Sequence, residues 1–149
     1  MGGGMPIGAF IASWELMNLL TFQPKLGHIT TFGGHPISCA AALATFNELQ
    51  QSNILSSISK KHALFKRYLK HPKIKKINGI GLMLALEFEN EIICREIIKK
   101  TLLNNVITFY FLFDKKCMRL SPPLTIKEEE IKESCQMIVK SINEYYMKK

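Results

Sequence analysis

The segment from Thr30 to Pro36 carries residue types that can bind an anion. It reads Thr-Thr-Phe-Gly-Gly-His-Pro, so two hydroxyl groups and two glycines come just before a proline that suits the first turn of a helix. Unpaired backbone N–H groups and the helix dipole favour a negative charge at such a helix start, commonly a phosphate. An N-capped turn without a ligand would use the same residues, so the segment alone leaves both interpretations open.

Arg119 is the second candidate for chemistry, in the segment Met-Arg-Leu-Ser-Pro-Pro-Leu. A guanidinium presents a planar fork that holds a carboxylate through two hydrogen bonds. An arginine in an otherwise apolar strand is costly to bury without such a partner. Lysine is the usual base of this chain, which favours a specific need for guanidinium here. An edge-strand arginine that reaches solvent or pairs with a structural acid is the alternative.

The remaining polar residues give weaker signals. The glycine loop Met1–Gly8 allows a close backbone approach to a ligand, although a flexible chain start has the same composition. The four histidines do not form a metal-ligand pattern, and His62 on an apolar helix stripe is expected to be a core or boundary residue. No metal site is predicted. The four cysteines are widely spaced, which is typical of neither a zinc site nor a disulfide scaffold, so reduced thiols in the cytoplasm are expected.

Alternating strands and helices must position these residues. Apolar periodicity and turn residues predict a buried strand over 9–13, a short helix over 14–20 and, after a basic connector over 71–81, three further strands. Thr125 and Glu128 are expected to form a capping box at the start of the last helix, whose apolar stripe begins at Ile131. The other helices are expected over 36–50, 53–69 and 89–105, and the three further strands over 82–88, 106–111 and 117–121.

These elements predict an α/β chain in two unequal parts. Residues 1–50 have one strand and one long helix, too few strands for a sheet, so we expect them to be the edge of a larger domain. Residues 51–149 have enough strands and helices for a small α/β domain of their own.

Composition limits the function classes. The chain has 149 residues, of which 47% are hydrophobic and 21% charged, as in a globular protein. No apolar run reaches the roughly 18 residues that a membrane helix needs, and we expect neither a membrane partner nor a secretory signal. The net charge of +8 is carried mainly by scattered lysines without regularly interleaved aromatic residues, so no nucleic-acid partner is expected. A basic nucleic-acid binder is the weakest of the alternatives.

The order of these segments resembles the C-terminal third of the class-III aminotransferases, which use pyridoxal 5'-phosphate (PLP), and especially the acetylornithine/ornithine-type branch. That family has the motifs T-T-[FY]-G-G-N-P, R-G-x-G-L-M and L-R-x-x-P-P-L in this order. This chain has His35 and Asn78 where the family has Asn and Arg. The resemblance implies a part of the PLP-dependent transferase fold (fold type I): the edge of the large domain plus a small α/β domain with a short antiparallel sheet.

The resemblance also implies roles for single residues. Thr31, beside Thr30, would bind the PLP phosphate of the neighbouring subunit in a homodimer, and Arg119 would bind the α-carboxylate of the substrate. The lysine that forms a Schiff base with the cofactor lies two positions before Met1 in the family pattern. We therefore expect no catalytic residue in this chain, and we expect the other PLP-binding residues upstream of the glycine loop.

The sequence thus predicts the C-terminal portion of a cytoplasmic aminotransferase in amino-acid metabolism, which moves an amino group between an amino acid and a 2-oxo acid. It would need the N-terminal portion of the enzyme, and the isolated chain is predicted to be inactive. The alternative is a non-catalytic truncated relic, or an oligomerisation or binding module.

Overall fold

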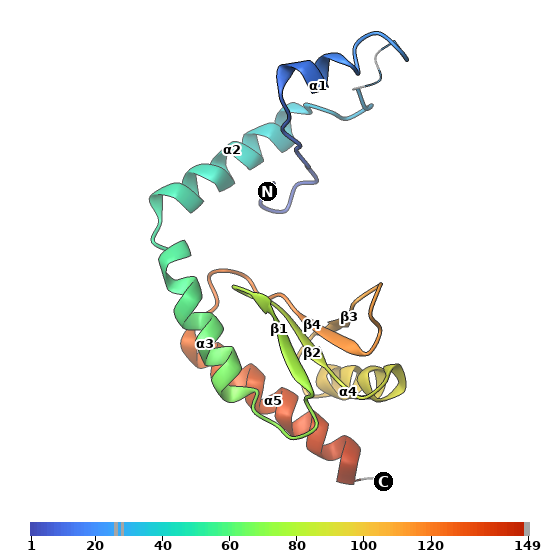
Figure 1. Cartoon of the computed structure of the whole chain (residues 1–149). Coiled ribbons are helices and arrows are strands. Elements are labelled where there is room, and N and C mark those ends of the chain that lie inside the picture. Colours follow the sequence, from blue (N-terminus) through green and yellow to red (C-terminus); the bar gives the residue numbers. More distant parts are fainter. Residues whose placement is uncertain (26, 28, 148–149) are drawn as a thin grey trace. The chain divides into compact units, whose positions relative to one another are not determined.

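The structure is a computed structural model that describes residues 1–25, 27 and 29–147. The chain folds as two compact units, Met1–Asn53 and Ile54–Lys149 (Figure 1). The predicted assignment of 1–50 to a large domain and of 51–149 to a small one concerns the whole enzyme, and it stays a prediction.

The first unit consists of loops and two helices, α1 (Trp14–Asn18) and α2 (Pro36–Gln51). The Ser13 hydroxyl accepts a hydrogen bond from the Leu16 N–H at 3.5 Å and caps α1. Pro36 occupies the first turn of α2, as predicted. Among the described residues of this unit only Gly2 and Ser38 are buried, so the unit has no apolar core of its own.

The buried strand predicted over 9–13 is wrong. These residues form no strand, and the side chains of Phe10 and Ile11 are 68% and 97% exposed. A strand needs a neighbouring strand for its backbone hydrogen bonds, and the described part of the first unit contains none. The apolar pattern alone therefore does not produce the element.

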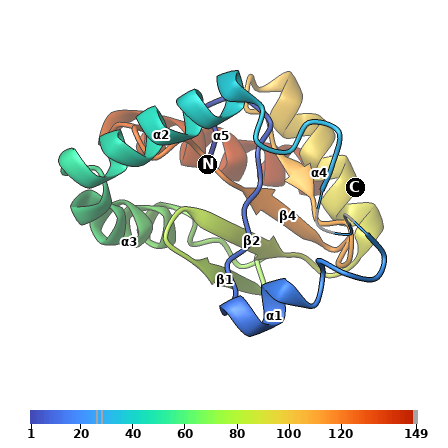
Figure 2. The ribbon, with the colours of Figure 1, turned by 90° about the horizontal axis from the view of Figure 1, so that it is seen from above.

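The second unit contains a four-stranded sheet in the order β1-β2-β4-β3, with every neighbouring pair antiparallel. Figure 2 shows β1, β2 and β4 side by side in this order. This confirms the predicted α/β class with a short antiparallel sheet. Its helices are the 3₁₀ turn η1 (Leu55–Ser57), α3 (Ile58–Tyr68), α4 (Glu91–Leu103) and α5 (Glu128–Met147), and its strands are β1 (Lys76–Ile80), β2 (Met83–Glu87), β3 (Phe109–Tyr110) and β4 (Cys117–Leu120).

One face of the sheet forms the core with the three long helices. Leu84 and Leu86 of β2 and Met118 of β4 are fully buried and belong to one cluster with side chains of α3, α4 and α5. Since side chains alternate along a strand, the residues between them lie on the opposite face. The stripe predicted for the last helix is confirmed as buried: Ile131, Cys135, Ile138 and Ile142.

Strand β1 lies where the sequence predicted only a connector. It pairs with β2 over its whole length, and Gly79 has φ +128. A Cβ atom at Gly79 would lie 2.1 Å from the carbonyl oxygen of Met83, so only glycine fits there. The glycine that permits this pairing is also what makes the segment look like a loop.

Helix α5 begins later than predicted. The Lys127 N–H donates to Glu130 Oε2 at 2.7 Å, and the Ile131 N–H donates to the carbonyl of Lys127 at 3.0 Å. Lys127 is therefore the residue that precedes the helix, and Glu130 supplies the side-chain bond. The predicted capping box of Thr125 and Glu128 is wrong by two positions, because Glu128 is itself the first residue of the helix.

Candidate functional site

The anion candidate of the first unit consists of two successive turns. The Gly33 N–H donates to the Thr30 carbonyl at 3.1 Å, and the His35 N–H donates to the Phe32 carbonyl at 3.2 Å. A Cβ atom at Gly33 would lie 2.7 Å from Thr30 Oγ1, and Gly34 has φ +73, so both positions favour glycine. His35 makes no side-chain bond to the helix start, which leaves the first N–H groups of α2 without a side-chain cap.

The structure brings the glycine loop and these turns together. A hollow of about 350 Å³ is lined by Pro6–Gly8 from the glycine loop, by Thr30 and Phe32–His35 from the turns, and by Ser38 from the first turn of α2. Ser38 is only 7% exposed. Hydroxyl groups and free helix N–H groups around such a hollow are suited to an anion. Thr31 does not line this hollow, and it is exposed.

Arg119 is the third residue of β4 and, by strand alternation, lies on the sheet face that points away from the core. Its register partners are Ala85 on β2 and Phe109 on β3. The Arg119 Nε atom is buried and has no hydrogen-bond partner. The Cζ atom of Arg119 is 5.7 Å from the centre of the Phe109 ring. Arg119 is also one of the residues that line a cavity of about 370 Å³, whose mainly apolar wall includes Val106, Pro122 and Pro123 as well as core residues such as Leu120.

No acid neutralises Arg119 among the described residues. Glu87, on the same face of β2, pairs with Lys116 at 2.7 Å. The hydrogen bond and the charge of Glu87 raise the pKa of Lys116 above its usual value. Arg119 therefore keeps a free positive charge next to an apolar cavity, where a buried unpaired donor calls for a partner. A carboxylate matches both the charge and the fork of donors.

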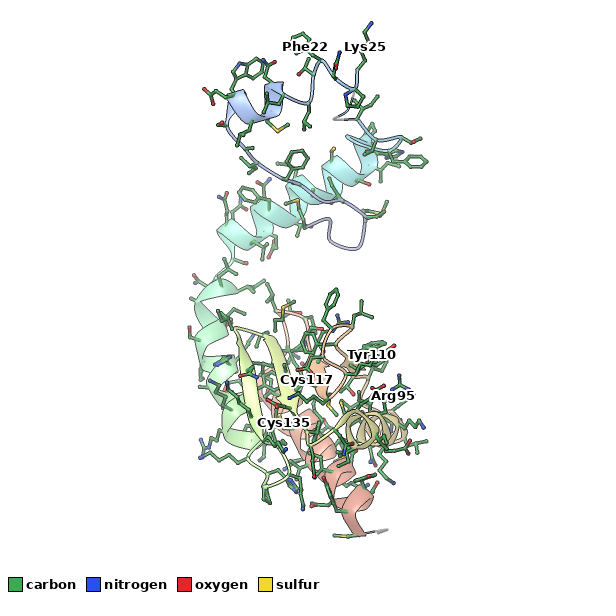
Figure 3. All side chains as sticks on the ribbon, turned by 45° about the vertical axis from the view of Figure 1, so that its right-hand side comes forward. Phe22, Lys25, Arg95, Tyr110, Cys117 and Cys135 are labelled. Carbon is green, nitrogen blue, oxygen red and sulfur yellow. The ribbon has the colours of Figure 1, made fainter. Side chains whose placement is uncertain are left out.

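His62 and the three buried cysteines have contacts that are typical of structural residues. His62 is half-buried and its Nδ1 lies 2.7 Å from the Gly81 carbonyl oxygen, as expected for a boundary residue. Cys94, Cys117 and Cys135 are buried free thiols. Burial raises their pKa to about 12, 11 and 12 in that order, so they stay protonated near neutral pH. Figure 3 shows Cys117 and Cys135 inside the second unit.

Other reactive arrangements are not found in the described part of the chain. There, no three His, Cys, Asp or Glu side chains gather closely enough for a metal ion, and no helix is long and apolar enough to span a bilayer. Lys25, the first lysine of the sequence, is exposed and points outward from its turn (Figure 3).

Sequence reasoning missed two residues of these sites, Phe109 and Ser38. Phe109 was expected only as part of a strand, since the register that places it opposite Arg119 depends on the hairpin connection. Ser38 follows Pro36 by two positions, so its place in the first helical turn could have been inferred from the proline.

The sequence matches known proteins over most of its length. A family model described as aminotransferase class-III matches residues 1–142. The chain is 35% identical over 147 residues to an acetylornithine aminotransferase of Caldanaerobacter subterraneus subsp. tengcongensis, covering 93% of this chain and 35% of the relative. It is 32% identical over 144 residues to that of Haemophilus ducreyi, covering 97% of this chain and 35% of the relative.

Solved structures give the same result for the fold. An ornithine aminotransferase of Toxoplasma gondii, with partial PLP occupancy at its active site, matches with a TM-score of 0.74 and 29% identity. The match covers 91% of this chain and 33% of that one. The chain thus spans about a third of the length of the curated relatives it matches.

Proposed function

Because this chain belongs to the class-III aminotransferase family, we propose that it forms the C-terminal portion of an enzyme that transfers an amino group from an amino acid to a 2-oxo acid. Both substrates carry an α-carboxylate. The observation that carries the proposal is Arg119, whose buried Nε has no partner and whose charge no described acid neutralises. Arg119 binds the α-carboxylate through its fork of N–H donors and so orients the substrate.

Class-III aminotransferases depend on PLP, and the first unit fits the phosphate group of that cofactor. Thr30, Ser38 and the first N–H groups of α2 surround a hollow suited to an anion. Thr31 is exposed and does not line this hollow, and we propose that it reaches the phosphate of a neighbouring subunit in a homodimer. When bound, PLP supplies the electron sink that the reaction requires. The side chains of this chain hold the phosphate and orient the carboxylate.

The exposed apolar side chains of the first unit support the proposal that it packs against a further portion of the enzyme. Large apolar side chains such as Phe10, Trp14 and Phe32 are 68%, 76% and 78% exposed, and the unit buries too little apolar surface to be stable by itself. We propose that they pack against the N-terminal portion, which carries the catalytic lysine of the family. The 149-residue chain alone is then inactive. The enzyme is proposed to be cytoplasmic, with neither nucleic acid nor membrane as a partner.

A chimaera tests this function. The first two-thirds of an acetylornithine aminotransferase relative, up to the residue that follows its catalytic lysine, would be joined to this chain and assayed with an amino-acid donor, 2-oxoglutarate and PLP. We expect turnover from the chimaera and none from the chain alone. Arg119→Ala should raise KM for the amino acid by about 30-fold or more, since it removes a charged hydrogen-bond donor from a buried site.

Arg95→Ala is the matched control, because Arg95 is already paired with Glu91 at 3.0 Å. It should leave KM unchanged. Turnover by the isolated chain would contradict the predicted inactivity. An inactive but folded chimaera would favour a binding module over an enzyme portion.

A further inference from the structure

Phe109 and Arg119 face each other across the β3–β4 pair, on the sheet face that points away from the core. The guanidinium carbon lies 5.7 Å from the centre of the phenyl ring. A cation at this distance is attracted by the ring and prefers to stack on it. The ring of Phe109 therefore restricts where the donors of Arg119 can point.

The core does not need the Phe109 ring. Its side chain is 54% exposed, whereas the preceding residue, Thr108, is buried and makes a 2.8 Å hydrogen bond to Thr101 Oγ1. An aromatic side chain at an exposed edge position contributes little to the stability of the core. Its position opposite an arginine gives it a different use.

The other flank of Arg119 leaves room for the guanidinium. Its register partner on β2 is Ala85, whose side chain is a single methyl group. A small residue on one side and an aromatic ring on the other define a slot for a planar group. An arginine held in such a slot loses less rotamer freedom when it binds a carboxylate.

A second arginine–aromatic pair in the same unit serves as an internal comparison. The Cζ atom of Arg95 lies 5.8 Å from the centre of the Tyr110 ring (Figure 3). Arg95 also has an ion pair with Glu91 at 3.0 Å. Arg119 has the ring without the acid. Arg67 also lies 5.9 Å from the centre of the Tyr68 ring and has no ion pair among the described residues, but it is exposed. Arg119 differs from both other arginines because it combines the ring with a buried Nε that has no hydrogen-bond partner, which prepares it for an external anion.

We propose that Phe109 is a positioning residue for substrate binding: it holds the Arg119 guanidinium flat, so that the donor fork faces the carboxylate. This inference rests on the proposed function of Arg119. It adds that affinity for the carboxylate depends on the aromatic ring at position 109 and not only on the charge.

Nuclear magnetic resonance of the full chain tests this directly. The sequence has only three arginines, Arg67, Arg95 and Arg119, so the ¹⁵N spectrum has three Nε–H signals, and Arg119→Lys assigns the one of interest. The chain would be titrated with 2-oxoglutarate, with its dimethyl ester as the neutral control. We expect the Arg119 signal to shift with the acid and not with the ester.

Phe109→Leu should weaken that binding about two- to fivefold and speed the exchange of the Arg119 Nε–H with water, whereas Phe109→Tyr should restore both. Tyr110→Leu, at the other stacked pair, is the matched control and should leave the affinity unchanged. Amide spectra would confirm that each variant is folded. Equal affinities and exchange rates for Phe109→Leu and the wild type would overturn the role of Phe109 alone. A wild-type Arg119 signal that does not move would overturn the carboxylate site as well.

Discussion

His62 Nδ1 lies 2.7 Å from the carbonyl oxygen of Gly81 and so connects helix α3 to the turn between β1 and β2. A carbonyl only accepts, so Nδ1 carries the proton in this contact. Gly81 has φ +58, a left-handed conformation that glycine adopts without steric cost, and the His62 bond supplies a donor for its carbonyl. The bond explains why a polar residue is accepted on an otherwise apolar helix stripe.

Replacement of His62 by leucine should therefore lower the free energy of unfolding by about 1–2 kcal/mol, because the Gly81 carbonyl loses its donor while the volume is nearly kept. Urea denaturation followed by circular dichroism measures the change. His35→Leu is the control, since His35 makes no side-chain bond at its helix start. Equal stability of the wild type and His62→Leu would mean that water replaces the lost donor.

The start of α5 gives a second prediction. Glu130→Ala should destabilise the second unit by about 0.5–1 kcal/mol, because the Lys127 N–H loses its side-chain acceptor. Glu129→Ala is the matched control: it removes the same charge from the same turn, so only Glu130→Ala also removes the bond. Thr125→Val should have little effect. A larger loss from Thr125→Val than from Glu130→Ala in thermal unfolding would restore the capping box that the sequence suggested.

The sequence predicted the second unit well because its helices bury periodic stripes. Ile131 and its equivalents at three- and four-residue spacing must face the core whatever the tertiary structure. The sequence-based prediction failed for the segments in which pairing with a neighbouring strand decides whether a strand forms. Residues 9–13 have the apolar pattern of a strand without a described neighbour in their unit, and β1 has a strand neighbour in spite of Gly79.

The candidate site shows the same limit. Arg119 could be singled out because its type is rare in the chain and costly to bury. The slot around Arg119 could not be predicted from the sequence, because Ala85 and Phe109 belong to two other strands. Their register with β4 follows from hairpin geometry rather than from local composition.

A functional arginine and a structural one differ in what their loss does to stability. Arg119→Met should leave the melting temperature unchanged or raise it, because the buried Nε has no partner to lose and methionine keeps the contact with Phe109. Leu120→Ala, at the next position but in the core, should cost about 2–5 kcal/mol. Differential scanning fluorimetry compares the two. A large loss for Arg119→Met would show that the guanidinium holds the sheet together rather than awaiting a ligand.

Because its cysteines are buried, the second unit is expected to lose stability at alkaline pH. Burial raises the pKa of Cys135 to about 12 in the folded chain, against about 8.5 in the unfolded one. Below about pH 8.5 both states keep the proton and the contribution is complete. Above it only the unfolded chain releases the proton, so the free energy of unfolding falls by about 1.4 kcal/mol per pH unit for this thiol.

Urea unfolding under reducing conditions, from about pH 7.5 to about pH 10.5, measures that slope. This range begins below and ends above the pKa of an unperturbed cysteine, which is about 8.5. Cys135→Ala lowers stability at every pH through the cavity it leaves, but its curve should fall less steeply than that of the wild type by about one proton. Cys39→Ala changes an exposed cysteine and should keep the wild-type slope. Parallel curves for Cys135→Ala and the wild type would mean that the Cys135 thiolate is tolerated in the folded core, in conflict with the complete burial of this α5 residue in the core cluster.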